Sequence, residues 1–339
     1  MRKSRRAAGG ISLSFLFFLA LSSGGAAISV QPHSRQEPEE FSEEYWVRPV
    51  PLQGTVPDGF TSLESSLYPK DCGACHQAQY ADWSGSLHSM AVGPGLLGQL
   101  SPDENPDFAA SCYLCHAPLS EQQEYLIVDG KYEKNNRFDE KLQKSGVSCG
   151  VCHVRGYRRF GPPPLKENKR GGGHGGFTAS SFFEQSEFCA ACHQFPEGAF
   201  ALNGKLLENT YNEWRASPYP EKGVTCQGCH MPGRRHLFRG IHDPEMVKSG
   251  VEILLKERKR GVLLTIINSN TGHYFPTYVP PLIVVRGSLL DKSGNPVDGS
   301  VKKKFIGRRV ELNLSREIED TRIPPLGRFV FDYSPDDTG

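Results

Sequence analysis

One short motif, Cys-x-x-Cys-His, occurs five times in this 339-residue chain and accounts for all ten of its cysteines. Two thiols separated by two residues can form thioether bonds to one haem, and the histidine that follows can supply an axial ligand of its iron. The motifs therefore predict five covalently bound haem c groups. The predicted attachment cysteines are Cys72, Cys75, Cys112, Cys115, Cys149, Cys152, Cys189, Cys192, Cys226 and Cys229, and the predicted proximal ligands are His76, His116, His153, His193 and His230.

Paired cysteines also occur in disulfide frameworks and at zinc sites. Neither alternative explains why a histidine directly follows the second cysteine in every copy. No cysteine remains outside a motif. Haem attachment is the interpretation that uses all of these residues.

Residues 1–27 have the three parts of a secretory signal peptide. The start is basic, an apolar stretch runs from Ile11 to Leu21, and the small residues at 25–27 offer a cleavage site. The apolar stretch is too short for a transmembrane helix. We therefore expect export to the periplasm, with outer-membrane association or an extracellular location as alternatives.

Composition divides the remaining chain into three predicted regions. Residues 28–66 are rich in Pro, Glu, Gln and Ser, which predicts an extended lead-in. Residues 67–246 carry the motifs among Gly, Pro and short helical patterns, so haems would supply most of the core of this domain. In residues 247–339, five runs read as β-strands: 251–255, 262–267, 282–290, 305–314 and 329–333. The predicted fold class is a mainly α and irregular multihaem domain followed by an antiparallel β-sandwich-like C-terminal domain.

The motif regions also indicate an internal repeat. The first and fourth motifs are each followed by Tyr-x-x-Trp-x-x-Ser, beginning at Tyr80 and Tyr211. The third and fifth motifs are each preceded by Gly-Val and a hydroxyl residue, beginning at Gly146 and Gly223. We therefore predict one unit made of motifs 1 and 3, a second made of motifs 4 and 5, and an insertion that carries motif 2.

A second axial histidine makes a haem a low-potential electron carrier, whereas an open position makes it a potential catalyst. Six histidines lie outside the motifs, and His33, in the lead-in, is predicted to be a bystander. The remaining five equal the number of motifs, which predicts a closed ligand set. The predicted distal ligands are His88, His174, His236, His242 and His273. Met90 and Met246 are the competing candidates, and Tyr219 occupies in the second repeat the place of His88 in the first.

Three stretches carry a family likeness: Cys72 to His88 with its Tyr-x-x-Trp, Tyr211 to Pro232, and the Gly272 to Pro276 turn. They resemble the superfamily of cytochrome c-554 and hydroxylamine oxidoreductase over about residues 67–276. The resemblance implies closely packed haem pairs that form a wire, and distal-ligand roles for His88, His174 and His273. The chain has five motifs and no Cys-x-x-Cys-Lys site of the kind found in ammonia-forming nitrite reductases.

The charge balance is near neutral, with 39 Lys and Arg against 38 Asp and Glu, which predicts no nucleic-acid partner and no anionic membrane surface. The first hypothesis is electron transfer between redox partner proteins, such as a quinol-oxidising membrane complex or other cytochromes. The alternative is an oxidoreductase in which one open haem acts on a small nitrogen or sulfur compound. An oligomer or an outer-membrane conduit is a third interpretation.

Overall fold

The computed structural model describes residues 38–100, 106–165, 174 and 176–335 of the chain. The predicted signal peptide and His33 therefore lie outside the described residues. Within this part, no helix is both long and apolar enough to cross a membrane.

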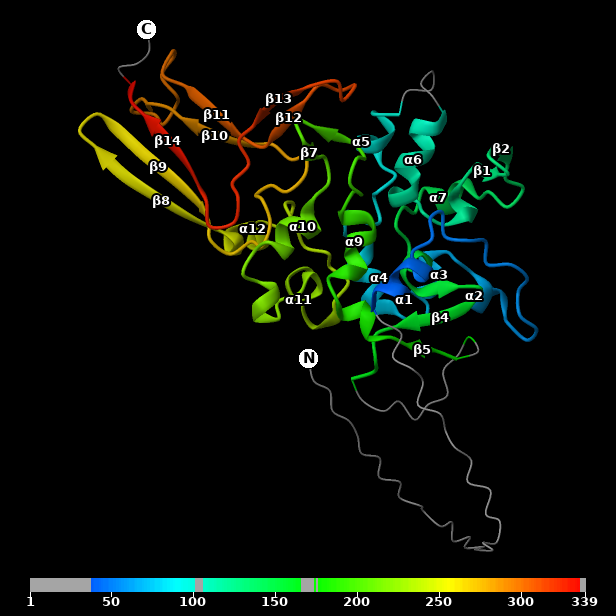
Figure 1. The fold of residues 1–339 in the computed structure, drawn as a ribbon. Helices are drawn as coiled ribbons and strands as arrows, with labels where there is room; N and C mark the ends of the chain where they lie inside the picture. The colour runs from blue at the N-terminus through cyan, green and yellow to red at the C-terminus, as the bar shows by residue number, and fades with distance from the viewer. Residues whose placement is uncertain (1–37, 101–105, 166–173, 175, 336–339) are drawn as a thin grey trace, which may run out of the picture. The chain divides into compact units, whose positions relative to one another are not determined.

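The helices are short, and most are one or two turns long (Figure 1). The α-helices of the described residues are α1 (Pro38–Tyr45), α2 (Ser62–Ser65), α3 (Pro69–Cys72), α4 (Gln77–Ser84), α5 (Pro94–Leu97), α6 (Pro106–His116), α7 (Glu140–Gln143), α8 (Cys149–His153), α9 (Glu187–His193), α10 (Thr210–Arg215), α11 (Cys226–His230) and α12 (Pro244–Gly250). Single 3-10 turns lie at η1 (Ser120–Gln122), η2 (Ser181–Glu184), η3 (Pro220–Lys222) and η4 (Pro232–Arg234).

The strands are also short and form several small sheets rather than one large sheet. They are β1 (Tyr125–Val128), β2 (Lys131–Lys134), β3 (Val154–Arg155), β4 (Arg158–Gly161), β5 (Thr178–Ala179), β6 (Ala201–Leu202), β7 (Lys205–Leu206), β8 (Val251–Arg258), β9 (Gly261–Asn268), β10 (Ile283–Gly287), β11 (Lys302–Ile306), β12 (Arg308–Val310), β13 (Glu317–Asp320) and β14 (Arg328–Tyr333).

The segment before the first motif contributes to the core, although the sequence predicted an extended lead-in. It forms α1 and α2, and the side chains of Tyr45 and Val50 are buried. The Tyr45 hydroxyl donates a hydrogen bond of 2.7 Å to the carbonyl oxygen of Cys152, and the Val50 N–H donates one of 2.6 Å to that of Pro118. The segment thereby packs against the regions that carry motifs 2 and 3.

The last part of the chain is rich in antiparallel strands. The sheet order is β14-β9-β8, with β10 paired to β11 and β12 paired to β13 in separate two-stranded sheets. The predicted turn at residues 259–261 joins β8 to β9, and Arg258 pairs with Gly261. A sandwich of two facing sheets stays a prediction, as do the domain boundaries. The boundary predicted after residue 246 falls inside α12, whose first turn is capped by the Asp243 carboxylate.

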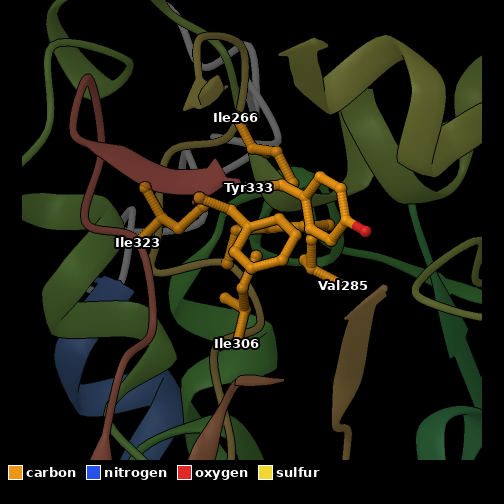
Figure 2. Close-up of a cluster of buried hydrophobic side chains, with 7 residues drawn as sticks. Ile266, Val285, Ile306, Ile323 and Tyr333 are labelled. Atoms are coloured by element: carbon orange, nitrogen blue, oxygen red, sulfur yellow. The ribbon is translucent and has the colours of Figure 1, made fainter. Parts of the chain in front are cut away.

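A compact apolar core joins these small sheets. Its buried members include Ile266 of β9, Val285 of β10, Ile306 of β11 and Tyr333 of β14, together with Ile323 from the loop before β14 (Figure 2). Burial of such side chains is the main favourable contribution to folding, at about 25 cal/mol per Å² of apolar surface. The core therefore holds β9, and the turn that follows it, in a fixed position.

Two details of the strand pattern differ from the prediction. The run 305–314 is split into β11 and β12 at Gly307, where a Cβ would meet the carbonyl oxygen of Pro281 at 2.9 Å. Strand β13 was not predicted, because Glu317, Glu319 and Asp320 give it a polar sequence. The ion pair of 2.8 Å between Glu317 and the buried Arg308 explains why such a strand is stable there.

Candidate functional site

The motifs lie on helices or at their ends, which brings the side chains of each motif together. Helices α8 and α11 begin at the first cysteine of a motif and end at its histidine, and α6 and α9 end at a motif histidine. In the first motif, α3 ends at Cys72, and His76 is the residue before α4. Residues three and four positions apart share one face of a helix, so the two thiols and the imidazole of a motif project to the same side.

Three of the predicted distal histidines lie opposite motif histidines from distant parts of the sequence. The ring centroids of His88 and His193 are 6.1 Å apart, those of His153 and His236 are 6.0 Å apart, and those of His230 and His273 are 6.1 Å apart. A metal–imidazole bond is about 2 Å long, so centroids about 6 Å apart fit one iron between a nitrogen of each ring. Three independent pairs therefore have the spacing of bis-histidine haem ligation.

Hydrogen bonds orient most of these rings. The Nδ1 of His153 lies 2.7 Å from the carbonyl oxygen of Phe160, and that of His273 lies 2.8 Å from the carbonyl oxygen of Tyr274. Similar Nδ1 contacts to main-chain carbonyls are made by His116 with Ala91, His230 with Arg239 and His236 with Arg234. A carbonyl can only accept, so Nδ1 carries the proton and Nε2 keeps the lone pair that binds a metal.

Burial also keeps these histidines neutral, as ligation requires. Loss of hydration lowers the pKa of His88 to about 3, and it lowers the pKa of His153 and of His273 to about 4. The pKa values of His230 and His236 are lowered for the same reason. Because a protonated imidazole has no lone pair to donate, these environments favour the metal-binding form at physiological pH.

The other two predicted distal ligands are placed differently. Among the described residues, no ring contact joins His174 or His242 to a motif histidine, and none joins His76 or His116 to a second histidine. The backbone N–H of His174 donates a hydrogen bond of 2.9 Å to Glu64, and His242 is exposed beside the cap of α12. Met90, a competing candidate, is 54% exposed. The distal roles of His174 and His242 stay predictions.

Thiols of different motifs lie close enough to shift one another's pKa, which shows which motifs are neighbours. The pairs are Cys72 with Cys149, Cys115 with Cys192, and Cys189 with Cys226. Motif 1 therefore lies beside motif 3, and motif 4 lies beside both motif 2 and motif 5. None of the ten cysteines forms a disulfide.

The internal repeat predicted from the sequence is confirmed by matching contacts. The indole N–H of Trp83, after motif 1, donates a hydrogen bond of 2.8 Å to the carbonyl oxygen of Val147, just before motif 3. In the second unit, Trp214 donates one of 3.1 Å to Val224, just before motif 5. Each tryptophan thus connects the two motifs of its unit in the same way.

A histidine-to-tyrosine difference between the two repeat units changes the ligand set. The N–H of Val147 donates to the carbonyl oxygen of His88 at 3.0 Å, and the N–H of Val224 donates to that of Tyr219 at 3.1 Å. His88 and Tyr219 are therefore equivalent positions, as predicted. Only His88 carries an imidazole, so the second unit offers no histidine at that place, and His230 of motif 5 has its partner His273 from the turn after β9.

Three residues that sequence reasoning missed support the histidine pairs. Phe238 makes edge contacts with two distal histidines, His88 at 4.2 Å and His236 at 6.0 Å between ring centroids. The Asp82 carboxylate accepts a hydrogen bond of 3.1 Å from the backbone N–H of His236. The side-chain amide of Asn268 donates one of 2.9 Å to the carbonyl oxygen of His273. No sequence pattern indicates these residues, because their contacts with the histidines form only when the chain is folded.

These residues fit haem groups. The described part of the chain contains no cluster of three or more His, Cys, Asp or Glu side chains that could hold a bare metal ion. Histidine pairs instead suit an iron whose other four ligands come from a porphyrin. With the paired thiols next to a histidine of each pair, the site defines a multihaem c-type cytochrome.

Comparisons with known proteins agree with this class. Residues 71–154, which contain motifs 1 to 3, match the family described as cytochrome c554 and c-prime. The match supports a multihaem c-type cytochrome, and the predicted likeness to cytochrome c554 is confirmed over these residues. No curated protein sequence matches the chain.

The fold is similar to that of a solved structure, a penta-heme cytochrome c552 from Thermochromatium tepidum. The two chains are 18% identical with a TM-score of 0.55, and the match covers 81% of this chain and 89% of the other. At this identity, the likeness concerns the fold alone. It supports a cytochrome-like arrangement of short helices and small sheets.

Proposed function

We propose that the chain binds five haem c groups and relays single electrons between redox partner proteins. The observation that carries this proposal is the set of three histidine pairs, each 6.0–6.1 Å between ring centroids. Two histidines close both axial positions of an iron, which favours electron transfer over binding of a substrate. The haem supplies reversible one-electron chemistry, and the protein supplies its attachment, ligands and surroundings.

The neighbouring motifs support a continuous path through the protein. Cysteine contacts join motif 1 to motif 3, and motif 4 to motifs 2 and 5. Phe238 joins motif 3 to motif 4, because it contacts a distal histidine of each. These are His88, which lies opposite His193 of motif 4, and His236, which lies opposite His153 of motif 3. The inferred order is 1-3-4-5, with motif 2 as a branch at motif 4.

We further propose that the protein works in the periplasm. The predicted signal peptide supports this location, as does the chemistry of covalent haem attachment, which takes place outside the inner membrane. The partners we propose are a quinol-oxidising membrane complex or other cytochromes. The near-neutral charge favours partner proteins over nucleic acids.

A second candidate function is supported by the first two motifs. No described histidine makes a ring contact with His76 or His116, so either iron is a candidate for an open axial position. An open haem acts on small molecules that coordinate iron. Reduction or oxidation of a small nitrogen or sulfur compound is the corresponding activity.

Protein-film voltammetry of the haem-replete protein distinguishes the two functions, after mass spectrometry has counted the attached haems. The relay predicts five reversible one-electron couples whose currents do not change when nitrite, hydroxylamine or sulfite is added. A catalytic current with any of these compounds would contradict the relay as the sole function. The variant His273→Ala, which removes one ligand, serves as a positive control for an opened iron.

A further inference from the structure

Strand β8 exposes an unusual amount of apolar surface at the edge of its sheet. It is an outer strand of the order β14-β9-β8, and only its β9 side is paired (Figure 1). The side chains of Ile253, Leu254 and Leu255 are 63%, 47% and 68% exposed. Natural edge strands usually avoid long apolar runs, because their free N–H and C=O groups pair readily with another strand.

Two of these side chains lie on the face of the sheet that builds the core. Ile253 pairs with Ile266 of β9, and Leu255 pairs with Leu264. Ile266 is a buried core residue, and Leu264 packs against the same core. Since paired residues of neighbouring strands project to the same face, the apolar core face continues onto β8 without being covered there.

We propose that β8 pairs with β8 of a second copy of the chain, in antiparallel orientation about a two-fold axis at Leu254. In this register Leu254 faces Leu254 of the second copy, Ile253 faces Leu255, and Glu252 faces Lys256. The three exposed apolar side chains then each meet an apolar one, Glu252 and Lys256 meet their opposite charges, and Val251 at the start of the strand lies opposite Glu257. The contact is isologous, as expected for a symmetric dimer.

Backbone geometry restricts the registers in which two copies of β8 can pair. Successive residues of a strand direct their N–H and C=O groups alternately to the two sides, so two copies of one edge can pair only residues of the same parity. The next allowed register, centred on Leu255, sets Leu254 against Lys256 and Ile253 against Glu257. Both of those contacts place an apolar side chain opposite a charge. The register centred on Leu254 is therefore the more complementary of the two, because it pairs all three exposed apolar residues with apolar residues.

The charges that flank the apolar run are available for this contact. Among the described residues, neither Glu252 nor Lys256 makes an ion pair or a side-chain hydrogen bond within its own chain. Cross-strand pairs of opposite charge stabilise a sheet, and like charges in the same positions destabilise it by similar amounts. The dimer would join two three-stranded sheets into one six-stranded sheet and remove the exposed edge of both.

Sedimentation velocity on the haem-replete protein over a range of concentrations tests the proposal. The wild type is expected to form a reversible dimer. The single changes Glu252→Lys and Lys256→Glu each set like charges against each other twice, and should raise the dissociation constant by about tenfold or more. The double variant with both changes restores opposite charges and should return the constant close to the wild-type value.

Lys303→Glu, which reverses an exposed charge on β11, is the matched control and should leave the dimer unchanged. The haem absorption spectrum of each variant checks that it is folded. A second measurement needs no variant: hydrogen exchange at the outward amides of β8 should slow as the concentration of wild-type protein rises. A wild-type monomer at all concentrations, single variants that dimerise normally, or a double variant that stays monomeric would each overturn the proposal.

Discussion

Replacement of Asn268 by alanine tests how the protein holds one of its distal ligands. Asn268 is fully buried at the end of β9. Its amide nitrogen donates hydrogen bonds of 2.9 Å to the carbonyl oxygen of His273 and 3.0 Å to that of Ile323, and its oxygen accepts from the N–H and hydroxyl of Thr271. Asn268 therefore joins both sides of the turn that presents His273. We classify it as a positioning residue.

The expected decrease in the free energy of unfolding follows from the hydrogen bonds that the partners of Asn268 lose. Both carbonyls keep another donor, since His273 also accepts from the Thr271 hydroxyl and Ile323 also accepts from the N–H of Phe275. Two lost hydrogen bonds are worth about 1 kcal/mol each, and the N–H of Thr271, left without its acceptor, costs about 1–3 kcal/mol. The free energy of unfolding should fall by about 3–5 kcal/mol. This corresponds to a decrease in Tm of about 10 °C.

Thermal unfolding and the spin state of the iron are the two measurements. The looser turn should leave a fraction of the haem between His230 and His273 high-spin, while the number of attached haems stays unchanged. The control is Ile306→Val in the same apolar core, which should cost about 1 kcal/mol without any change in spin state. A loss below 1 kcal/mol for Asn268→Ala, with an unchanged spectrum, would refute the positioning role.

The remaining predictions concern two ion pairs, one at Asp82 and one at the buried Arg308. Asp82→Asn should lower the free energy of unfolding by about 1–2 kcal/mol and loosen His236, because the Asp82 carboxylate accepts hydrogen bonds from the Arg235 guanidinium and the His236 N–H. Chemical unfolding measures the stability, and the spin state of the iron measures the position of His236. The hydrogen bond from Arg235 lowers the pKa of Asp82, so its stabilising effect is complete above about pH 4 and is lost as the pH falls further; Asp82→Asn should flatten this part of the stability profile. Arg308→Met should cost about 3–5 kcal/mol in chemical unfolding, since it removes the 2.8 Å ion pair with Glu317 and the hydrogen bonds that the buried guanidinium donates to the carbonyl oxygens of Leu202, Lys205 and Leu206. Glu317 keeps its ion pair with Lys205, so Glu317→Gln alone should cost less than Arg308→Met.

Short-range patterns made the class of the protein and the repeat predictable. Thioether chemistry requires the two cysteines and the histidine of each motif within five residues, so the attachment sites are visible in the sequence. The repeat was visible because Trp83 and Trp214 occupy equivalent positions, and their hydrogen bonds to Val147 and Val224 confirm it. The strand β9 was visible because its apolar residues face the core.

Long-range contacts could not be predicted in the same way. The partner of His193 is His88, which lies in the other repeat unit, and no local pattern encodes such a pair. Phe238 is one of nineteen phenylalanines, and only its place between two histidines distinguishes it. The lead-in was predicted to be extended because its composition is polar, yet Val50 is fully buried, and packing against the motif regions outweighs that composition.

The central claim is that two histidines close each iron, so that the haems carry electrons and do not bind substrates: three pairs are in place for motifs 3, 4 and 5, and His174 and His242 are predicted to close the other two. Electron paramagnetic resonance of the oxidised, haem-replete protein, recorded with and without nitrite, tests this claim most directly. We predict five low-spin centres that nitrite does not change. In His88→Ala, His236→Ala and His273→Ala, one further centre each should become high-spin with no loss of covalent haem. A high-spin signal in the wild type that shifts with nitrite, or an unchanged low-spin spectrum in these three variants, would contradict the account.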